Sequence, residues 1–269
     1  MPIVTIARNP YSRAGEIARR VARQLGYECV GPQMVAQACM ELSLQNKAEA
    51  GRAPRLLELF SQERERSAAL YRAAFYECMK LGDLVYYGLA GHVFLAGAPS
   101  VLHVRVSAPA EDRIFEAMRR EGWSRREAQS RIQQGDEWRR AWTEQLRGKG
   151  FNESESCDIH VNLAHLSAEA AVEVIVSSAR ISGKDDGASL QQYVRDMALE
   201  AQAEARLLSV FPNAMATASN GELCVMVDAS TVRDELAARR ARQELEELPD
   251  MNQASVGVTD HWRTPFENA

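Results

Sequence analysis

The feature that most constrains the fold is the alternation of short β-branched runs with helical patterns through the first two thirds of the chain. Such alternation favours an α/β unit in which helices flank a mainly parallel sheet. The run VLHVRV has hydrophobic residues on both faces, which predicts a central strand. The expected strands are 3–6, 84–89, 101–106 and 158–163, and the expected helices are 15–25, 33–42, 56–81, 110–121, 124–147 and 167–178.

A polar, glycine-containing segment at 181–189 breaks this pattern and is the expected linker between two domains, 1–180 and 190–260. After it, helix and strand patterns follow in the order α-β-β-α-β, which predicts a small α+β module. Asn220-Gly221 stands between two of the strand patterns and indicates a hairpin turn. Residues 261–269 are expected to form a loose tail.

Composition narrows the classes of partner and compartment. The 269 residues carry a net charge of −5, so no global field favours nucleic acid. Five scattered cysteines without a CxxC pair suggest neither a zinc site nor a disulfide framework, and they fit a reducing cytoplasm. The histidines show no metal-ligand spacing, so no metal site is assigned. No apolar run is long enough to predict a transmembrane segment or signal peptide, and the apolar stretch 86–99 is expected to hold a buried strand and its flanking turns.

The segment VTIARNPYSRAGEIARRVARQLG at 4–26 runs from a strand through a turn into a basic helix. This is the layout of a phosphate loop, in which backbone N–H groups at a helix N-terminus surround a phosphate. Glycine is needed in such a loop where φ is positive or where a Cβ would block the phosphate. The turn has a single glycine, Gly15, at its end.

The first domain resembles the cytidylate kinase-like family of P-loop phosphotransferases over about 3–178. The resemblance rests on ARNPYSRAGEIA, LGYECVGPQMV, HVRVSAPAEDRIFEAMRREGWSRREAQSRI, GDEWRRAW and CDIHVNLAHLSAEAAVEVI. It implies a P-loop kinase fold with a helical lid near 124–150, and ATP and Mg²⁺ as cofactors if the site is active. It also implies phosphate-binding groups at Arg8, Ser12, Arg13, Ala14, Gly15 and Glu16, and catalytic groups at Arg131, Asp136 and Arg139.

The chain departs from the family pattern at positions that matter for phosphate binding. Tyr11, Arg13 and Ala14 stand where the family has glycines. The family's aspartate turn is replaced by Gly31-Pro32, and its Gly-Arg after the middle strand by Gly88-Leu89. These changes add Cβ atoms to the loop and remove charges that would position a nucleotide.

Several site residues have a second interpretation. Ser12 is either a Mg²⁺ ligand or a helix N-cap, and the cap is favoured. Asp136 and Arg139 are three residues apart, so they fit a surface ion pair on a solvated helix as well as a pair of lid residues. Arg131 lies on roughly the same helix face as Arg139.

The segment from 220 to 258 resembles the BON family of small α+β domains, with a chain-specific appendage as the alternative. Three functions therefore stay open. The first is a degenerate kinase-like module that binds a nucleotide or other phosphate-bearing molecule weakly, in a regulatory or scaffolding role. The second is an active ATP-dependent kinase for CMP or a similar acceptor. The third is an interaction protein whose C-terminal module binds a protein partner or a second copy.

Overall fold

The computed structural model of this chain describes residues 3–45, 64–147, 156–182, 187–228, 234–246, 248–249 and 251–259. The chain divides into two compact units, one formed by 1–32 and 81–190 and the other by 33–80 and 191–269. The structure thus groups residues 33–80 with the C-terminal part of the chain, an arrangement that the sequence pattern did not indicate.

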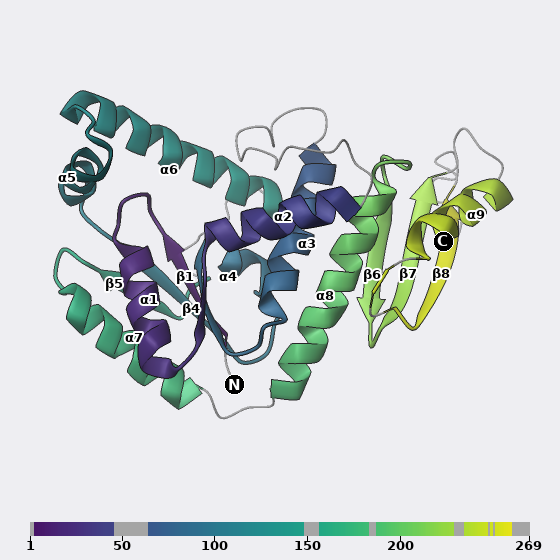
Figure 1. The fold of residues 1–269 in the computed structure, drawn as a ribbon, viewed down its shortest axis with the longest axis horizontal. Helices are drawn as coiled ribbons and strands as arrows, with labels where there is room; N and C mark the ends of the chain where they lie inside the picture. Colours follow the sequence, from purple (N-terminus) through teal and green to yellow (C-terminus); the bar gives the residue numbers. More distant parts are fainter. Residues whose placement is uncertain are drawn as a thin grey trace, which may run out of the picture. The chain divides into compact units, whose positions relative to one another are not determined.

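The first unit is built on a five-stranded parallel sheet with the strand order β2-β3-β1-β4-β5 (Figure 1). This confirms the predicted α/β class. The strands are β1 (Ile3–Arg8), β2 (Glu28–Val30), β3 (Leu84–Gly88), β4 (Val101–Ser107) and β5 (Ile159–Asn162). The helices are α1 (Ala14–Leu25), α4 (Gly91–Phe94), α5 (Ala110–Glu121), α6 (Arg125–Arg147) and α7 (Ala168–Ser182).

The core of this unit forms where α1 and α7 pack together on the sheet (Figure 1). In α1, Ile17 and Val21 are four residues apart and fully buried, as the 3.6-residue period requires. Burying each such side chain is worth about 1.5–3 kcal/mol. This packing fixes the first turn of α1 beside the end of β1.

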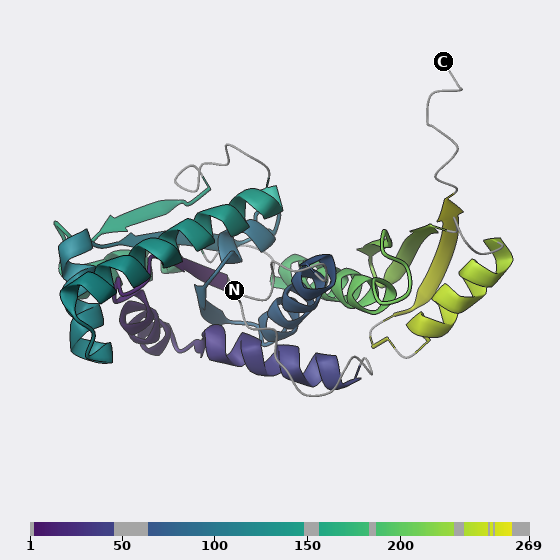
Figure 2. The same cartoon turned by 90° about the horizontal axis from the view of Figure 1, so that it is seen from above.

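β1 occupies the middle of the sheet, where Val4 lies opposite Val85 of β3 on one side and Leu102 of β4 on the other. β2 and β3 lie on one side of β1, and β4 and β5 lie on the other, so the order of the strands reverses at β1. α/β proteins bind ligands outside the carboxyl ends of the strands at such a point. The turn of residues 9–13, which joins β1 to α1, lies there. α5 and α6 follow β4 and are in contact, inclined steeply to one another and joined by a short turn (Figure 2); this two-helix unit is called the α5–α6 hairpin below.

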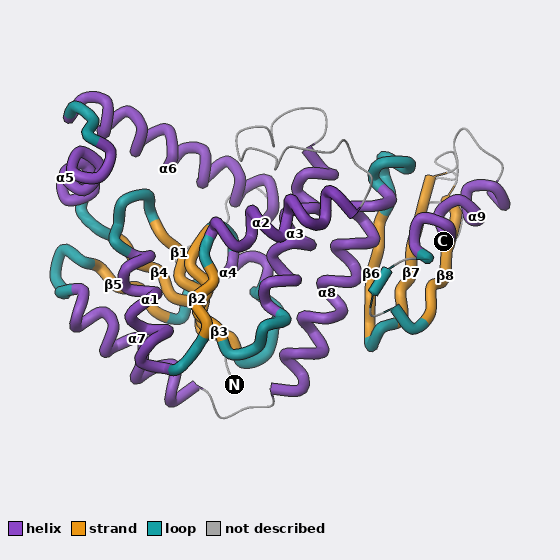
Figure 3. The backbone as a smooth tube through the Cα atoms, in the orientation of Figure 1, coloured by secondary structure: helices purple, strands orange, loops and turns teal. Residues whose placement is uncertain are grey.

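The second unit contains a three-stranded sheet with the order β6-β7-β8 (Figure 3). β6 and β7 are antiparallel, whereas β7 and β8 are parallel. The elements are α2 (Pro32–Gln45), α3 (Arg64–Met79), α8 (Gly187–Leu207), β6 (Met215–Ser219), β7 (Glu222–Asp228), α9 (Asp234–Leu245) and β8 (Gln253–Thr259). The last five follow the α-β-β-α-β order that the sequence predicted.

The predicted hairpin turn is present, and a buried carboxylate stabilises it. Asn220 and Gly221 both have positive φ, 52° and 77°, as a two-residue hairpin loop requires. The Asp196 carboxylate accepts hydrogen bonds from the backbone N–H groups of both residues, each at 2.9 Å. Asp196 is only 9% exposed, so this contact ties α8 to the turn.

Two elements were not predicted. β2 has three residues with no clear alternation, and α4 is a single turn within the apolar stretch 86–99. The predicted helix 56–81 is present as α3 from Arg64, and its earlier part lies outside the described residues, as does the predicted tail. The domain boundaries and the linker at 181–189 stay predictions, with α7 ending at Ser182 and α8 beginning at Gly187.

Candidate functional site

The turn between β1 and α1 has the backbone of a glycine loop without its glycines. Tyr11 and Arg13 have φ values of 59° and 60°, in the left-handed region that costs an L-residue about 1–2 kcal/mol. The sequence had marked both positions as ones that favour glycine. Ala14, the third such position, is instead the first helical residue of α1. Arg8 is the last residue of β1, opposite Val106.

Ser12 is buried in this turn, and its expected role as the N-cap is wrong. The cap of α1 is Arg13, whose carbonyl accepts hydrogen bonds from the N–H groups of Glu16 at 2.9 Å and Ile17 at 3.2 Å. Ser12 therefore stands one residue too early to cap the helix. The residue is 1% exposed, and its Oγ has no hydrogen-bond partner in the described part of the chain.

Arg13 and Glu16 form a closed ion pair at the N-terminus of α1. Arg13 Nε donates to Glu16 Oε2 and Arg13 Nη2 to Glu16 Oε1, both at 3.0 Å. The hydrogen bond to Glu16 raises the pKa of Arg13. A carboxylate in the first turn also interacts favourably with the helix dipole. Glu16 therefore places a negative charge at the N-terminus of α1. In a phosphate loop, the negative charge at this place is that of the bound ligand.

Tyr87, at the end of β3, fills the space beside Gly15. A Cβ on Gly15 would lie 2.9 Å from Tyr87 Cε2, and a Cβ on Gly31 would lie 2.7 Å from the Tyr87 hydroxyl. A basic side chain at position 15, in the first turn of α1, would thus collide with this ring. The same ring covers Gly31, at the position of the family's aspartate turn.

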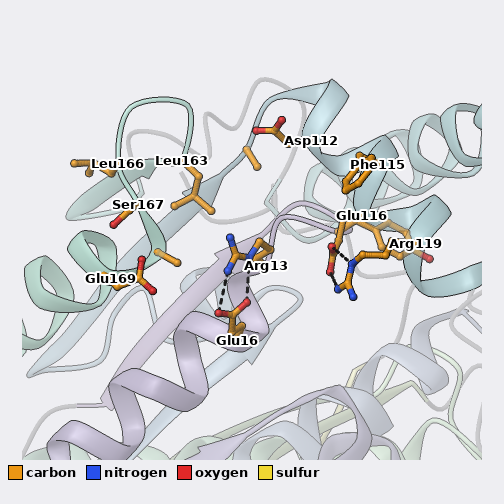
Figure 4. Close-up of a pocket in the computed structure, with 13 residues that line it drawn as sticks. Arg13, Glu16, Asp112, Phe115, Glu116, Arg119, Leu163, Leu166, Ser167 and Glu169 are labelled. Carbon is orange, nitrogen blue, oxygen red and sulfur yellow. Dashed lines mark hydrogen bonds and ion pairs between the residues drawn. The ribbon is translucent and has the colours of Figure 1, made fainter.

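A cavity of about 560 Å³ opens between the turn, α5 and the segment that joins β5 to α7 (Figure 4). Phe115, Leu163 and Leu166 form apolar parts of its wall. Its charged lining comprises two arginines and four acids, so the formal charge of the wall is negative. These charged residues are Arg13, Arg119, Glu16, Asp112, Glu116 and Glu169.

Two acids of this wall, Glu116 and Glu169, have lowered pKa values. Hydrogen bonds from Arg119 lower the pKa of Glu116, and Arg120 contributes in the same direction. A hydrogen bond from Arg20, at 2.7 Å, is the first cause that lowers the pKa of Glu169 to about 2. At neutral pH the cavity therefore presents ion pairs and carboxylates to an incoming anion.

The three predicted catalytic residues, Arg131, Asp136 and Arg139, all lie on α6, and each makes its own contacts. The guanidinium of Arg131 lies over the Trp123 ring, 5.6 Å from its centroid. Asp136 forms a bidentate ion pair with Arg113, at 2.8 and 3.0 Å, where the sequence had suggested Arg139. The Arg139 carbonyl accepts a hydrogen bond from the Thr143 hydroxyl at 3.0 Å.

Arg113 is the residue of this site that sequence reasoning missed. It lies in the first turn of α5, and its Nε donates to the Pro10 carbonyl at 2.8 Å while its Nη atoms bind Asp136. Its side chain is 7% exposed. The available signal was its spacing four residues before Ala117, which places a charged residue on the buried face of the helix.

Within the described residues, no group of three or more His, Cys, Asp or Glu side chains is placed to hold a metal ion. No helix among them is long and apolar enough to cross a membrane.

A sequence model of the cytidylate kinase-like family matches residues 3–165, which is more than half of the chain. No curated protein matches the sequence. Among solved structures, an uncharacterised protein from Eubacterium ventriosum is similar with a TM-score of 0.52 and 13% identity, over 67% of this chain and 99% of that chain. A shikimate kinase from Acinetobacter baumannii, in complex with shikimate, gives a TM-score of 0.41 and 13% identity, over 69% and 96%.

Proposed function

Because the chain belongs to the cytidylate kinase-like family, we propose that its first unit is a member with a degenerate phosphate loop. It binds a nucleotide or another phosphate-bearing small molecule weakly, and it acts as a regulatory or scaffolding module instead of transferring phosphoryl groups. The observation that carries this proposal is the bidentate pair between Arg13 and Glu16. A ligand phosphate at the N-terminus of α1 would have to displace that carboxylate.

The physical requirement for phosphoryl transfer is positioning together with neutralisation of charge by Mg²⁺ and basic groups. The residues present do not fit the phosphates of ATP with Mg²⁺. Arg13 is already paired, position 15 has no room for a basic side chain beside Tyr87, and acids dominate the charged cavity wall. The buried Ser12 Oγ, which has no partner in the described residues, supports weak residual binding of an anion.

A second candidate is an active ATP-dependent kinase for CMP or a similar acceptor. The left-handed backbone at Tyr11 and Arg13 favours it, because the path of a phosphate loop is kept despite its conformational cost. In that case Arg8, Arg13, Arg131 and Arg139 would have to supply the positive charge that the phosphates need, in a turn that lacks the family's glycines.

The test measures thermal unfolding with Mg²⁺ and ATP, CMP, CTP or inorganic phosphate at millimolar concentration, beside an assay of transfer from ATP to CMP. A ligand at 100 times its Kd adds about 2.7 kcal/mol to stability, so we expect small shifts and no transfer. A matched variant, Glu16→Gln, leaves the helix intact and releases Arg13, and it should bind phosphate more tightly than the wild type. Transfer by the wild type at ~1–100 per second would overturn the proposal.

The scaffolding part of the proposal concerns the module at 190–260, which we expect to contact a protein partner or a second copy. Its sheet exposes Met215 by 66% and Met226 by 38%, and these residues lie opposite one another on β6 and β7. All five cysteines are free thiols, which supports a cytoplasmic location. If Met215→Glu together with Met226→Glu leaves the sedimentation behaviour of a self-associating wild type unchanged, this face is not the contact.

A further inference from the structure

We propose that Arg113 is a positioning residue that fastens the α5–α6 hairpin to the turn before α1, so that this hairpin is a fixed wall of the site and not a lid that opens. Arg113 binds the Pro10 carbonyl of the turn and the Asp136 carboxylate of α6 at once. Three segments far apart in sequence thus meet at one guanidinium. The fastening holds whether or not the turn binds a nucleotide.

Burial makes this ion pair different from a surface pair. The Arg113 side chain is 7% exposed and that of Asp136 27%. Moving the hairpin off the turn would keep this pair, since both residues belong to the hairpin, but it would leave the Pro10 carbonyl without its donor and break the bond from Asn9 to Asp136. A polar group that loses its partner in a largely buried contact is costly. The two hydrogen bonds to Asp136 fix the planar guanidinium, and they therefore hold its Nε toward the Pro10 carbonyl.

Asn9 and Pro10 add contacts between the turn and α6. Asn9 Nδ2 donates to Asp136 Oδ1 at 3.2 Å. A Cβ built on Gly135 would lie 3.2 Å from Pro10 Cγ, so the glycine allows α6 to approach the turn closely. The contact between the turn and α6 therefore depends on close packing as well as on hydrogen bonding.

Tyr11 continues the attachment on the next residue of the turn. Its ring meets Trp123 edge-on with centroids 6.0 Å apart. It also packs against the small apolar cluster between α5 and α6, formed by Ile114, Ala117, Ala128 and Ile132. Three consecutive residues, 9 to 11, are thus attached to the hairpin.

The same two helices offer a matched control. Arg125 of α6 pairs with Glu111 of α5 at 2.5 Å, but both side chains are mostly exposed, 62% and 67%. This pair bridges the hairpin without touching the turn, and an exposed pair contributes little. Glu111→Gln therefore removes one α5–α6 ion pair while leaving the attachment to the turn intact.

Hydrogen exchange of the full-length chain tests the proposal. In Asp136→Asn, we expect the Ser12 amide, bonded to Asn9, and the amides of 125–140 to exchange at least about tenfold faster than in the wild type. Glu111→Gln should leave them unchanged, and Asp136→Glu should restore part of the protection. The β4 amides, which report on unfolding of the whole unit, should stay as slow as in the wild type.

Two results would overturn the proposal. One is equal exchange in Asp136→Asn and Glu111→Gln. The other is uniform acceleration that includes β4, since a general loss of stability needs no specific attachment. If Asp136→Asn does not fold, Gly135→Ala presses on Pro10 without weakening helix propensity. It should produce the same local pattern, and unchanged exchange in that variant would count against the proposal.

Discussion

Because the backbone at Arg13 is left-handed, we expect glycine to give a more stable protein than alanine at this position. This is the opposite of the order found within a helix. Arg13→Ala and Arg13→Gly both remove the guanidinium, so both lose the Arg13–Glu16 pair. With side chains 48% and 36% exposed, that pair contributes about 0–1 kcal/mol. The two variants differ only by the Cβ, at a position where φ is 60° and ψ is 6°.

The magnitude follows from two opposing effects. Removing the Cβ relieves about 1–2 kcal/mol of left-handed strain, whereas glycine adds about 0.5–1 kcal/mol of entropy to the unfolded chain. We therefore expect Arg13→Gly to be more stable than Arg13→Ala by about 0.5–1 kcal/mol. At Arg23, exposed on α1, the order should reverse, because alanine is favoured over glycine within a helix by about 1 kcal/mol.

Urea unfolding followed by tryptophan fluorescence measures both pairs of variants. Three of the four tryptophans, Trp123, Trp138 and Trp142, lie in the first unit, and the fourth, at position 262, is outside the described residues. The midpoint should shift without a change in slope if only stability changes. If alanine equals or exceeds glycine at position 13 while the Arg23 pair behaves as expected, the left-handed backbone of this turn is refuted.

The remaining predictions concern three other positions. Asp196→Ala should cost the second unit about 2–3 kcal/mol in thermal unfolding, because the N–H groups of Asn220 and of the buried Gly221 lose a charged acceptor; a loss below 1 kcal/mol would contradict this. Burial, and then the Glu204 charge, raise the pKa of Glu200 above 4.5, so its contribution to stability is fully present below that value and falls as pH rises through the raised pKa. Glu200→Gln should therefore stabilise the unit at pH 7 more than at pH 4, and an equal effect at both would refute the assignment. Gly15→Ala should cost about 1–3 kcal/mol by overpacking against Tyr87, and a double-mutant cycle with Tyr87→Ala should recover most of it.

The parts of the fold that the sequence predicted are those encoded locally. The buried stripe of α1 and the Asn220-Gly221 turn each depend on residues a few positions apart, so period and turn chemistry are sufficient to find them. β2 and α4 are too short to show a period. The missed contact of Arg113 is tertiary, since Asp136 is 23 residues away and Pro10 is 103, and no spacing rule within one helix reveals it.

The candidate site shows the same division between local and tertiary causes. The sequence identified Tyr11 and Arg13 as positions that favour glycine, and both have positive φ. It could not show what holds them there. Tyr11 is held by packing against Trp123, and the turn just before it by the hydrogen bond from Arg113 to the Pro10 carbonyl.

Strained backbone persists only where the surrounding structure over-determines it, and this turn meets that condition without any ligand. Its neighbours supply the constraints, through the aromatic contact of Tyr11, the Arg113 bond and the Arg13–Glu16 pair. The loss of loop glycines is therefore compatible with an intact loop backbone. The proposed weak binding rests instead on the chemistry at the helix N-terminus, where Arg13 is paired with Glu16 and four acids face two arginines in the cavity wall.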